Sequence, residues 1–251
     1  MIGMLREYSH SGSVRVLMSG FQEFFIKQTD YEGPFVNFAK IVRLSGFSNS
    51  EIDDFLVQPL QFWGDIAPSP LLTLVTTRVG RHPLLLQYFG KALFEKVARR
   101  ATASDVNAAA RHLLDSDGIK IFEEAVDELF MRTGSATERF LFLKRCREAE
   151  LHGESLVDVE INDQWTKEVL NSIGYSSTYD RRRLILESLE LKSLTTSIGS
   201  NRSRQRIAAP IIYSYLRYTE SEIDTLIDTL GEDAAGECQE AVVGTLDDGV
   251  A

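Results

Sequence analysis

The stretch Thr77-Arg-Val-Gly-Arg-His-Pro-Leu-Leu-Leu-Gln-Tyr-Phe-Gly-Lys-Ala-Leu-Phe-Glu-Lys-Val97 joins a polar corner to a strongly apolar helix pattern. In the corner, Gly80-Arg81-His82-Pro83, the glycine permits a sharp turn. The proline suits the first helical position, because an N–H there has no helical partner in any case. Apolar side chains on almost every face of the following segment are typical of a buried helix. The corner therefore either starts this helix or contacts a ligand.

The chain has 251 residues, enough for one large or two small domains with cores of their own. It contains no apolar run of membrane-spanning length, and residues 1–10 lack the apolar core of a signal peptide, so we expect a cytoplasmic protein with no membrane contact. Cys146 and Cys238 alone are too few for a disulfide framework or a zinc site.

The net charge of −10 is unevenly distributed. Residues 1–134 and 135–217 carry −2 and +2, whereas residues 218–251 contain 10 acidic and no basic side chains. The part of the chain with a folding pattern is therefore nearly neutral, and its charge does not exclude an anionic ligand.

Residues 46–133 show a pattern of helices with short connections, which predicts a compact helical domain. Helix starts are indicated by the capping box Ser48-Asn-Ser-Glu51, by Pro70 and Pro83, and by Thr102. A further helix is amphipathic over residues 117–131. Before this domain, residues 14–19 and 40–44 are short strand candidates, with a turn at Gly33-Pro34.

After Gly134 the order of elements changes. Expected in sequence are a helix to about residue 149, a strand, two helices and two strands joined by a turn, which is the order of a winged helix. The strands fall at residues 156–161, 194–198 and 204–208, and the two helices at residues 163–173 and 178–189. A helix over residues 219–230 follows, and from Gly231 onward the acidic, glycine-rich tail is predicted to be disordered.

This layout resembles the C-terminal part of STAND-type ATPases, relatives of the AAA+ P-loop ATPases. Residues 1–45 resemble the end of the ATPase core, residues 46–133 the helical lid and residues 134–218 the winged helix, with a terminal helix and acidic tail at 219–251. The resemblance implies a mostly α (α+β) fold: a remnant of an α/β core, a helical lid bundle and a C-terminal winged-helix domain.

In that family the proline of the lid corner packs on the adenine of a bound nucleotide. The resemblance therefore implies that Pro83 contacts the base, with His82 beside it, and that Ser19 faces the γ-phosphate as a polar sensor. Arg81 stands where the family usually has glycine. It could reach a phosphate, but we expect a solvated or ion-paired surface arginine.

The motifs that hold phosphates and metal are missing. The sequence contains no Gly-x-x-x-x-Gly-Lys-Ser/Thr string (Walker A), and no apolar strand ends in Asp-Asp or Asp-Glu (Walker B). Because hydrolysis requires the phosphates and Mg²⁺ to be held in place, we predict no ATPase activity for the chain alone. ATP and Mg²⁺ would bind only with a completing P-loop segment.

The favoured function is therefore a non-catalytic regulatory or interaction fragment of a STAND-like ATPase. Its expected partner is a P-loop-containing chain or a missing N-terminal half, and a further protein partner could bind the winged helix. The four histidines, His10, His82, His112 and His152, show no metal-ligand spacing, so no metal site is predicted. No motif for a covalent nucleophile was found either, so no catalytic residue is assigned.

An alternative function is a winged-helix protein that binds nucleic acid on a degenerate ATPase scaffold. Its candidate contacts are Arg181, Arg182 and Arg183 near the start of the second winged-helix helix, and Arg202, Arg204 and Arg206 in and after the hairpin turn. Alternation along the strand would place the last three on one face. A second alternative is a truncated product of a full ATPase gene, which an in-frame P-loop sequence upstream of Met1 would reveal.

Overall fold

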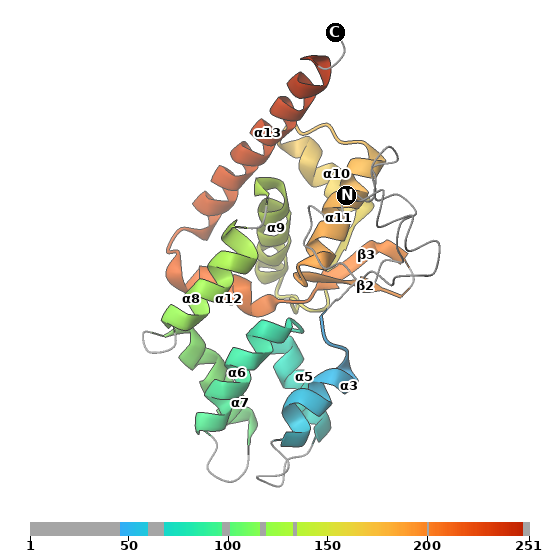
Figure 1. Cartoon of the computed structure of the whole chain (residues 1–251). Coiled ribbons are helices and arrows are strands. Elements are labelled where there is room, and N and C mark those ends of the chain that lie inside the picture. The colour runs from blue at the N-terminus through green and yellow to red at the C-terminus, as the bar shows by residue number, and fades with distance from the viewer. Residues whose placement is uncertain are drawn as a thin grey trace, which may run out of the picture. The chain divides into compact units, whose positions relative to one another are not determined.

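The computed structural model describes residues 46–59, 68–96, 101–115, 119–132, 135–199 and 201–247, all within one compact unit of the chain, Ser45–Ala251 (Figure 1). Most of these residues are helical, and a small three-stranded sheet accompanies the helices, so the predicted mostly α fold class is confirmed. The strands predicted at residues 14–19 and 40–44 and the turn at Gly33-Pro34 lie outside the described residues.

Residues 46–132 form the helical block, whose helices begin where the sequence places capping residues. The Ser48 hydroxyl accepts the Glu51 N–H at 3.3 Å, and the Glu51 carboxylate accepts the Ser48 N–H at 2.7 Å. Thr102 and Asp105 form the same reciprocal cap. The elements are α3 (Asn49–Ile52) with a π-helical turn (Asp53–Val57), α5 (Pro68–Arg78), α6 (Pro83–Lys96), α7 (Ala103–Leu114), and α8 (Ile119–Val126) with a π-helical extension (Asp127–Arg132).

The core of the helical block is built around α6, as its apolar sequence predicts. Apolar side chains of α3 and α5 pack with those of α6 in one continuous core that also reaches into the rest of the unit. The fully buried residues of α6 are Leu85, Leu86, Phe89 and Leu93. Burying an aliphatic or aromatic side chain of this size stabilises the fold by roughly 1.5–3 kcal/mol.

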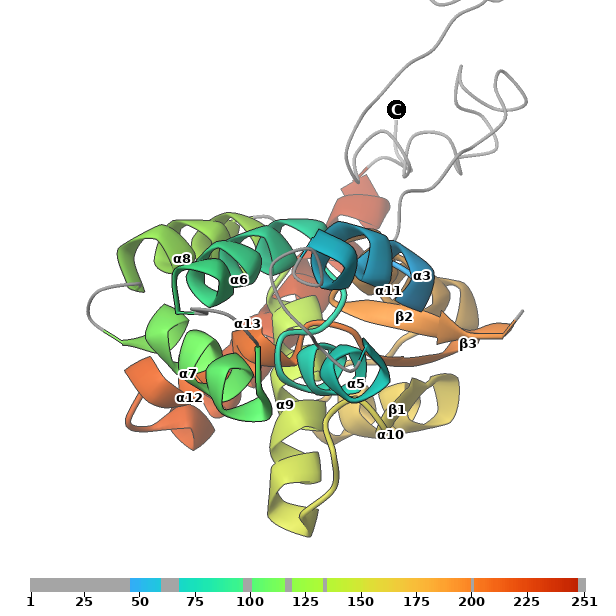
Figure 2. The ribbon, with the colours of Figure 1, turned by 90° about the horizontal axis from the view of Figure 1, so that it is seen from below.

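Residues 135–208 form the sheet block, in which a helix, a strand, two helices and a β-hairpin follow one another and Ala208 closes the block by donating its N–H to the Leu194 carbonyl. The strands pair antiparallel in the order β1-β3-β2, with Glu160 opposite Arg206 and Thr195 opposite Ile207. Figure 2 shows the hairpin beside α11. The elements are α9 (Ala136–His152), β1 (Glu160–Asn162), α10 (Asp163–Ser172), α11 (Tyr179–Leu191), β2 (Thr195–Ile198) and β3 (Asn201–Ile207).

Polar contacts fix the hairpin against α11. Gln205, fully buried on the central strand β3, accepts the Thr195 hydroxyl at 2.5 Å and donates to the Leu186 carbonyl of α11 at 2.8 Å. On β2, an edge strand of the described sheet, the Ser197 N–H donates to the Glu190 carboxylate at 3.1 Å. The buried side chain of Gln205 therefore has both its amide oxygen and its amide nitrogen hydrogen-bonded, as buried polar groups require.

Helix α12 (Pro210–Thr219) belongs to both blocks. It contacts α5 and α7 of the helical block and α9 of the sheet block. Tyr215 of α12 packs edge-on against Phe122 of α8, with 5.5 Å between the ring centroids. The segment that leads from β3 into α12 is therefore the place where the two blocks meet.

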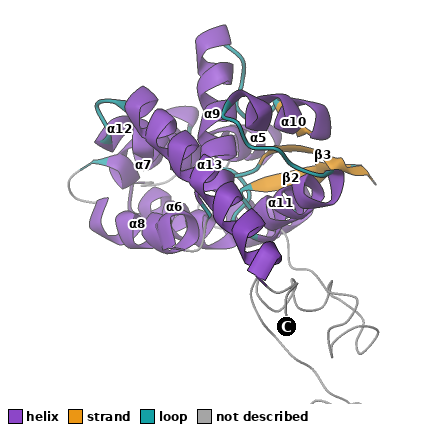
Figure 3. Cartoon of the chain, turned by 90° about the horizontal axis from the view of Figure 1, so that it is seen from above, coloured by secondary structure: helices purple, strands orange, loops and turns teal. Residues whose placement is uncertain are grey.

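The last helix, α13 (Ile223–Asp247), runs along α9 (Figure 3). The prediction that the chain is disordered from Gly231 onward is wrong for the described residues, because the helix continues to Asp247. Gly231 allows close packing, since a Cβ there would lie 3.2 Å from the Phe140 ring, and Ala234 is fully buried. A composition that suggests disorder is thus overruled by packing against α9.

Candidate functional site

The corner at residues 80–83 lies at the junction between the helical block and the sheet block. Gly80 has φ +101°, a conformation that side chains other than glycine rarely adopt. A Cβ at this position would lie 2.0 Å from the Ala208 carbonyl oxygen and 2.8 Å from Pro210 Cδ. The glycine is therefore required both by its backbone angle and by the close approach of the turn between β3 and α12.

Arg81 joins three segments through its backbone and its side chain. Its N–H donates to the Ala208 carbonyl at 2.7 Å, and its own carbonyl accepts the Phe47 N–H at 2.8 Å. Its guanidinium donates to the Phe47 carbonyl at 3.0 Å and to Asn49 Oδ1 at 2.6 Å. Phe47 and Asn49 lie at the start of the helical block and Ala208 at the end of the sheet block.

The sequence had led us to expect a solvated or ion-paired surface arginine at position 81, and among the described residues the side chain has no ion-pair partner. It is partly buried, and burial lowers the pKa of its guanidinium. Both of its hydrogen-bond acceptors, a backbone carbonyl and an amide oxygen, are neutral. The Arg81 side chain links two chain segments that are more than thirty residues apart in sequence, and such a contact leaves no local sequence pattern.

His82 caps the buried helix α6. Its Nδ1 accepts the Leu84 N–H at 3.2 Å, so the neutral ring carries its proton on Nε2. Burial lowers the pKa of His82 to about 4, so the imidazole is uncharged near neutral pH. Pro83 is the first residue of α6, as predicted, and is only partly buried.

Of the four residues predicted to face nucleotide, three are therefore neighbours at one structural junction. Ser19 lies outside the described residues. Sequence reasoning missed Phe47, Asn49 and Ala208, which hold the corner through hydrogen bonds. Two of the four hydrogen bonds join backbone groups only, and such bonds leave no residue-type signal in a sequence.

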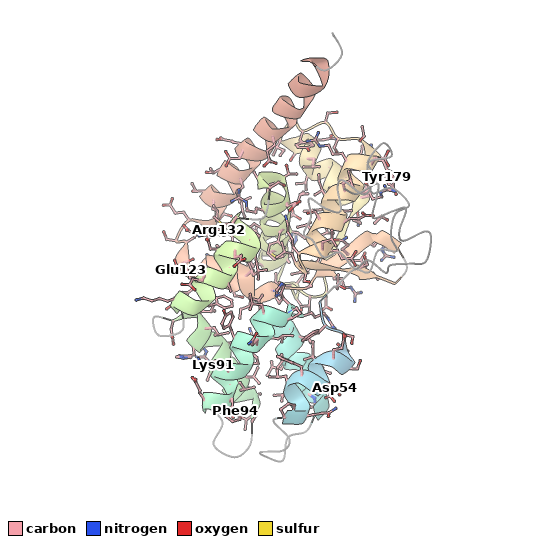
Figure 4. The ribbon with its side chains drawn as sticks, viewed as in Figure 1. Asp54, Lys91, Phe94, Glu123, Arg132 and Tyr179 are labelled. Carbon is pink, nitrogen blue, oxygen red and sulfur yellow. The ribbon has the colours of Figure 1, made fainter. Side chains whose placement is uncertain are left out.

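The arginines of α11 divide between the interior and the surface. Arg182 has 6% of its surface exposed and donates to both carboxylate oxygens of Asp163, at 2.7 and 3.0 Å, and to the Ser177 carbonyl. These hydrogen bonds to Asp163 raise the pKa of Arg182. Arg181 stacks over the Tyr175 ring at 5.2 Å, and Arg183 is exposed. Tyr179, at the start of α11, also projects to the surface (Figure 4).

The arginines of β3 lie on a different face from those of α11. Gln205 points toward α11, so its neighbours Arg204 and Arg206 point to the opposite face of the sheet. One guanidinium nitrogen of Arg204 donates to both carboxylate oxygens of Glu160, at 2.8 and 2.9 Å. The side chain of Arg202 lies outside what the structure describes. Among the predicted nucleic-acid contacts whose side chains are described, those of β3 and those of α11 are therefore not brought together on one surface.

A search for metal ligands among the described residues finds no group of three or more His, Cys, Asp or Glu side chains placed to hold an ion. In the same part of the chain, every helix is too short or too polar to cross a membrane. Comparisons of the chain with protein-family models, with curated proteins and with solved structures found no match.

Proposed function

We propose that this chain supplies the lid and winged helix of a STAND-like P-loop ATPase and acts as a non-catalytic regulatory fragment. In this proposal residues 46–133 are the lid and residues 134–218 the winged helix. A helix, a strand, two helices and a hairpin follow the helical block, with strand order β1-β3-β2, and this arrangement supports the assignment. The nucleotide would be held mainly by a P-loop-bearing segment or partner chain.

The observation that carries the proposal is the position of the corner. Gly80 and Arg81 contact Ala208 of the sheet block, Arg81 also contacts Phe47, and His82 and Pro83 open the central helix of the helical block. A ligand that touches the corner therefore touches a place where a backbone hydrogen bond, from the Arg81 N–H to the Ala208 carbonyl, joins the two blocks. This is the geometry that a lid and winged helix need in order to respond together to nucleotide.

The chemistry of the corner suits a base better than a phosphate. A neutral His82 and the Pro83 ring offer apolar, polarisable surface, whereas the guanidinium of Arg81 is engaged by Phe47 and Asn49. An adenine would pack on the proline ring, and its phosphates would need N–H groups and cations supplied elsewhere. We therefore expect weak binding of the base and little contribution from the phosphates or Mg²⁺.

The test is photolabelling of the full chain with 8-azido-ADP, whose azide is on the base, followed by peptide mapping. We expect label on the peptide that contains residues 81–83, with adenosine competing as well as ATP. Pro83→Ala should reduce this label, and Pro70→Ala, at an exposed proline of α5, should not. Label at other peptides only, or tight ATP·Mg²⁺ binding by calorimetry, would contradict the proposal.

A further inference from the structure

The first residues of the helical block are connected to the end of the sheet block through a single residue. The Phe47 N–H donates to the Arg81 carbonyl at 2.8 Å, and the Arg81 N–H donates to the Ala208 carbonyl at 2.7 Å. Both hydrogen bonds are made by the backbone of Arg81. A displacement of Phe47 would therefore shift Arg81, and Arg81 would in turn shift Ala208. Residues 47, 81 and 208 are far apart in the sequence, and local secondary structure does not explain these bonds.

The side chain of Arg81 adds further hydrogen bonds to residues 47 and 49. Its guanidinium binds the Phe47 carbonyl and the Asn49 side chain, so Phe47 is held at both its N–H and its carbonyl. The fit is close at Gly46, where a Cβ would lie 3.1 Å from both the Cβ and the carbonyl oxygen of Arg81. Residues 46–49 are thus held along one side of Arg81 by backbone, side-chain and steric contacts.

The guanidinium of Arg81 is held by uncharged partners. Within the described residues the guanidinium has no carboxylate partner, and hydrogen bonds to neutral oxygens are weaker than those of a paired ion. Burial also opposes the charge, as the lowered pKa of Arg81 indicates. Arg182 offers a comparison within the chain, because it forms a bidentate pair with a carboxylate, that of Asp163. Arg81 therefore has weaker partners than Arg182, although Arg81 lies at the junction of the two blocks.

We propose that Arg81 is a conformational latch that ties residues 46–49 to the turn between β3 and α12. In the latched state, movement of residues 46–49 is passed to the sheet block through Ala208. In the unlatched state, the guanidinium leaves Phe47 and Asn49 for water, and residues 46–49 lose their side-chain tie to Arg81 while the core stays folded. The latch extends the proposed function and rests on it for one point only, namely that nucleotide causes the movement of residues 46–49.

The test is hydrogen exchange at residue resolution on the full chain without nucleotide. Arg81→Ala should speed exchange at the amides of residues 47 and 81 by at least tenfold and leave the amides of α9 and α13 unchanged. Asn49→Ala removes one acceptor only, so it should act in the same direction with a smaller effect, and the double variant should equal Arg81→Ala alone. The matched control is Arg78→Ala, at an exposed arginine of α5, which should match the wild-type chain.

Two outcomes would overturn the latch: wild-type protection at residues 47 and 81 in both Arg81→Ala and Asn49→Ala, or equal acceleration at all amides, which means global destabilisation. Neither result depends on nucleotide. If photolabelling fails while exchange behaves as expected, the latch stands and the nucleotide-facing function is wrong. If photolabelling succeeds while exchange does not behave as expected, the nucleotide-facing function stands and the latch is wrong.

Discussion

Gly80 is a glycine for two separate reasons, and Gly153 shares only one of them. Both residues have positive φ, +101° and +68°, which favours glycine. At Gly80 an added Cβ would also overlap the Ala208 carbonyl, whereas at Gly153 no atom lies within 4 Å of that position. The pair therefore separates the effect of backbone conformation from the effect of the contact between blocks.

We expect Gly80→Ala to lower the free energy of unfolding by about 3 kcal/mol or more, because backbone strain and a steric clash add together. Gly153→Ala should lower it by only about 1 kcal/mol, the approximate strain of a left-handed alanine. Urea denaturation followed by circular dichroism measures both. Equal losses in the two variants would show that the contact at Ala208 contributes nothing.

Adjacent arginines on α11 have different roles because neighbouring residues of a helix point in different directions. Arg182→Ala would leave Asp163 without its bidentate partner, and we expect a loss of about 3 kcal/mol in the free energy of unfolding. Arg183 is exposed, so Arg183→Ala should change it by less than about 0.5 kcal/mol. Chemical denaturation checks both values, and similar losses would contradict the assignment of Arg182 to the interior.

At the scale of elements, α13 is stabilised by its contacts with α9. Residues 218–251 contain no basic side chain, so this helix lacks the favourable side-chain ion pairs that support a solvent-exposed helix. Contacts with α9 replace them: Asp224 binds Arg147, and Glu237 accepts the Ala136 N–H at 2.7 Å and the Thr137 hydroxyl at 2.8 Å. The carboxylate of Glu237 thus satisfies the first turn of α9 from a distant part of the chain.

We expect Glu237→Ala to lower the free energy of unfolding by about 1–2 kcal/mol, the usual cost of losing a helix N-cap. For a unit of this size this corresponds to a melting temperature lower by roughly 2–8 °C. Glu232→Ala, at an exposed position of the same helix, should leave the melting temperature nearly unchanged. Differential scanning calorimetry compares the two, and an unchanged melting temperature for Glu237→Ala would show that this contact is not stabilising.

The sequence predicts an element well when its signals are local. The caps at Ser48 and Thr102 mark helix starts that the structure contains. The sequence did not predict that α13 continues beyond Gly231, because this part of the helix depends on packing against Phe140 and on the hydrogen bond between Glu237 and the start of α9. The corner shows both cases, because its turn and helix start are local whereas its partners lie more than thirty residues away in either direction.

At the scale of the whole unit, His82 makes the junction sensitive to acid. The pKa of His82 in the folded state is about 4, below the ordinary value of 6.5, so the unfolded chain binds more protons between these values. Stability therefore decreases as pH falls from 6.5 toward 4. A protonated Nδ1 can no longer accept the Leu84 N–H, so the loss acts directly on the cap of the central helix.

We expect His82→Asn to flatten this part of the pH profile, because an amide oxygen can still cap α6 but does not titrate. The contribution of His82 to the difference in unfolding free energy between pH 6.5 and pH 4 is up to about 3 kcal/mol. Denaturation curves of both proteins across this range supply the test. If the two profiles are parallel, His82 is not the group responsible.

The hydrogen bond that the Ser197 N–H donates to Glu190 has a consequence for self-association of this protein. Strand β2 has no strand neighbour on its outer side in the described sheet, and an edge strand with free N–H groups is a template for strand addition. The Glu190 carboxylate occupies one of those groups and adds negative charge beside the edge. A chain without it would present an open edge, and concentrated solutions would gain a route to edge-to-edge aggregation that the native side chain blocks.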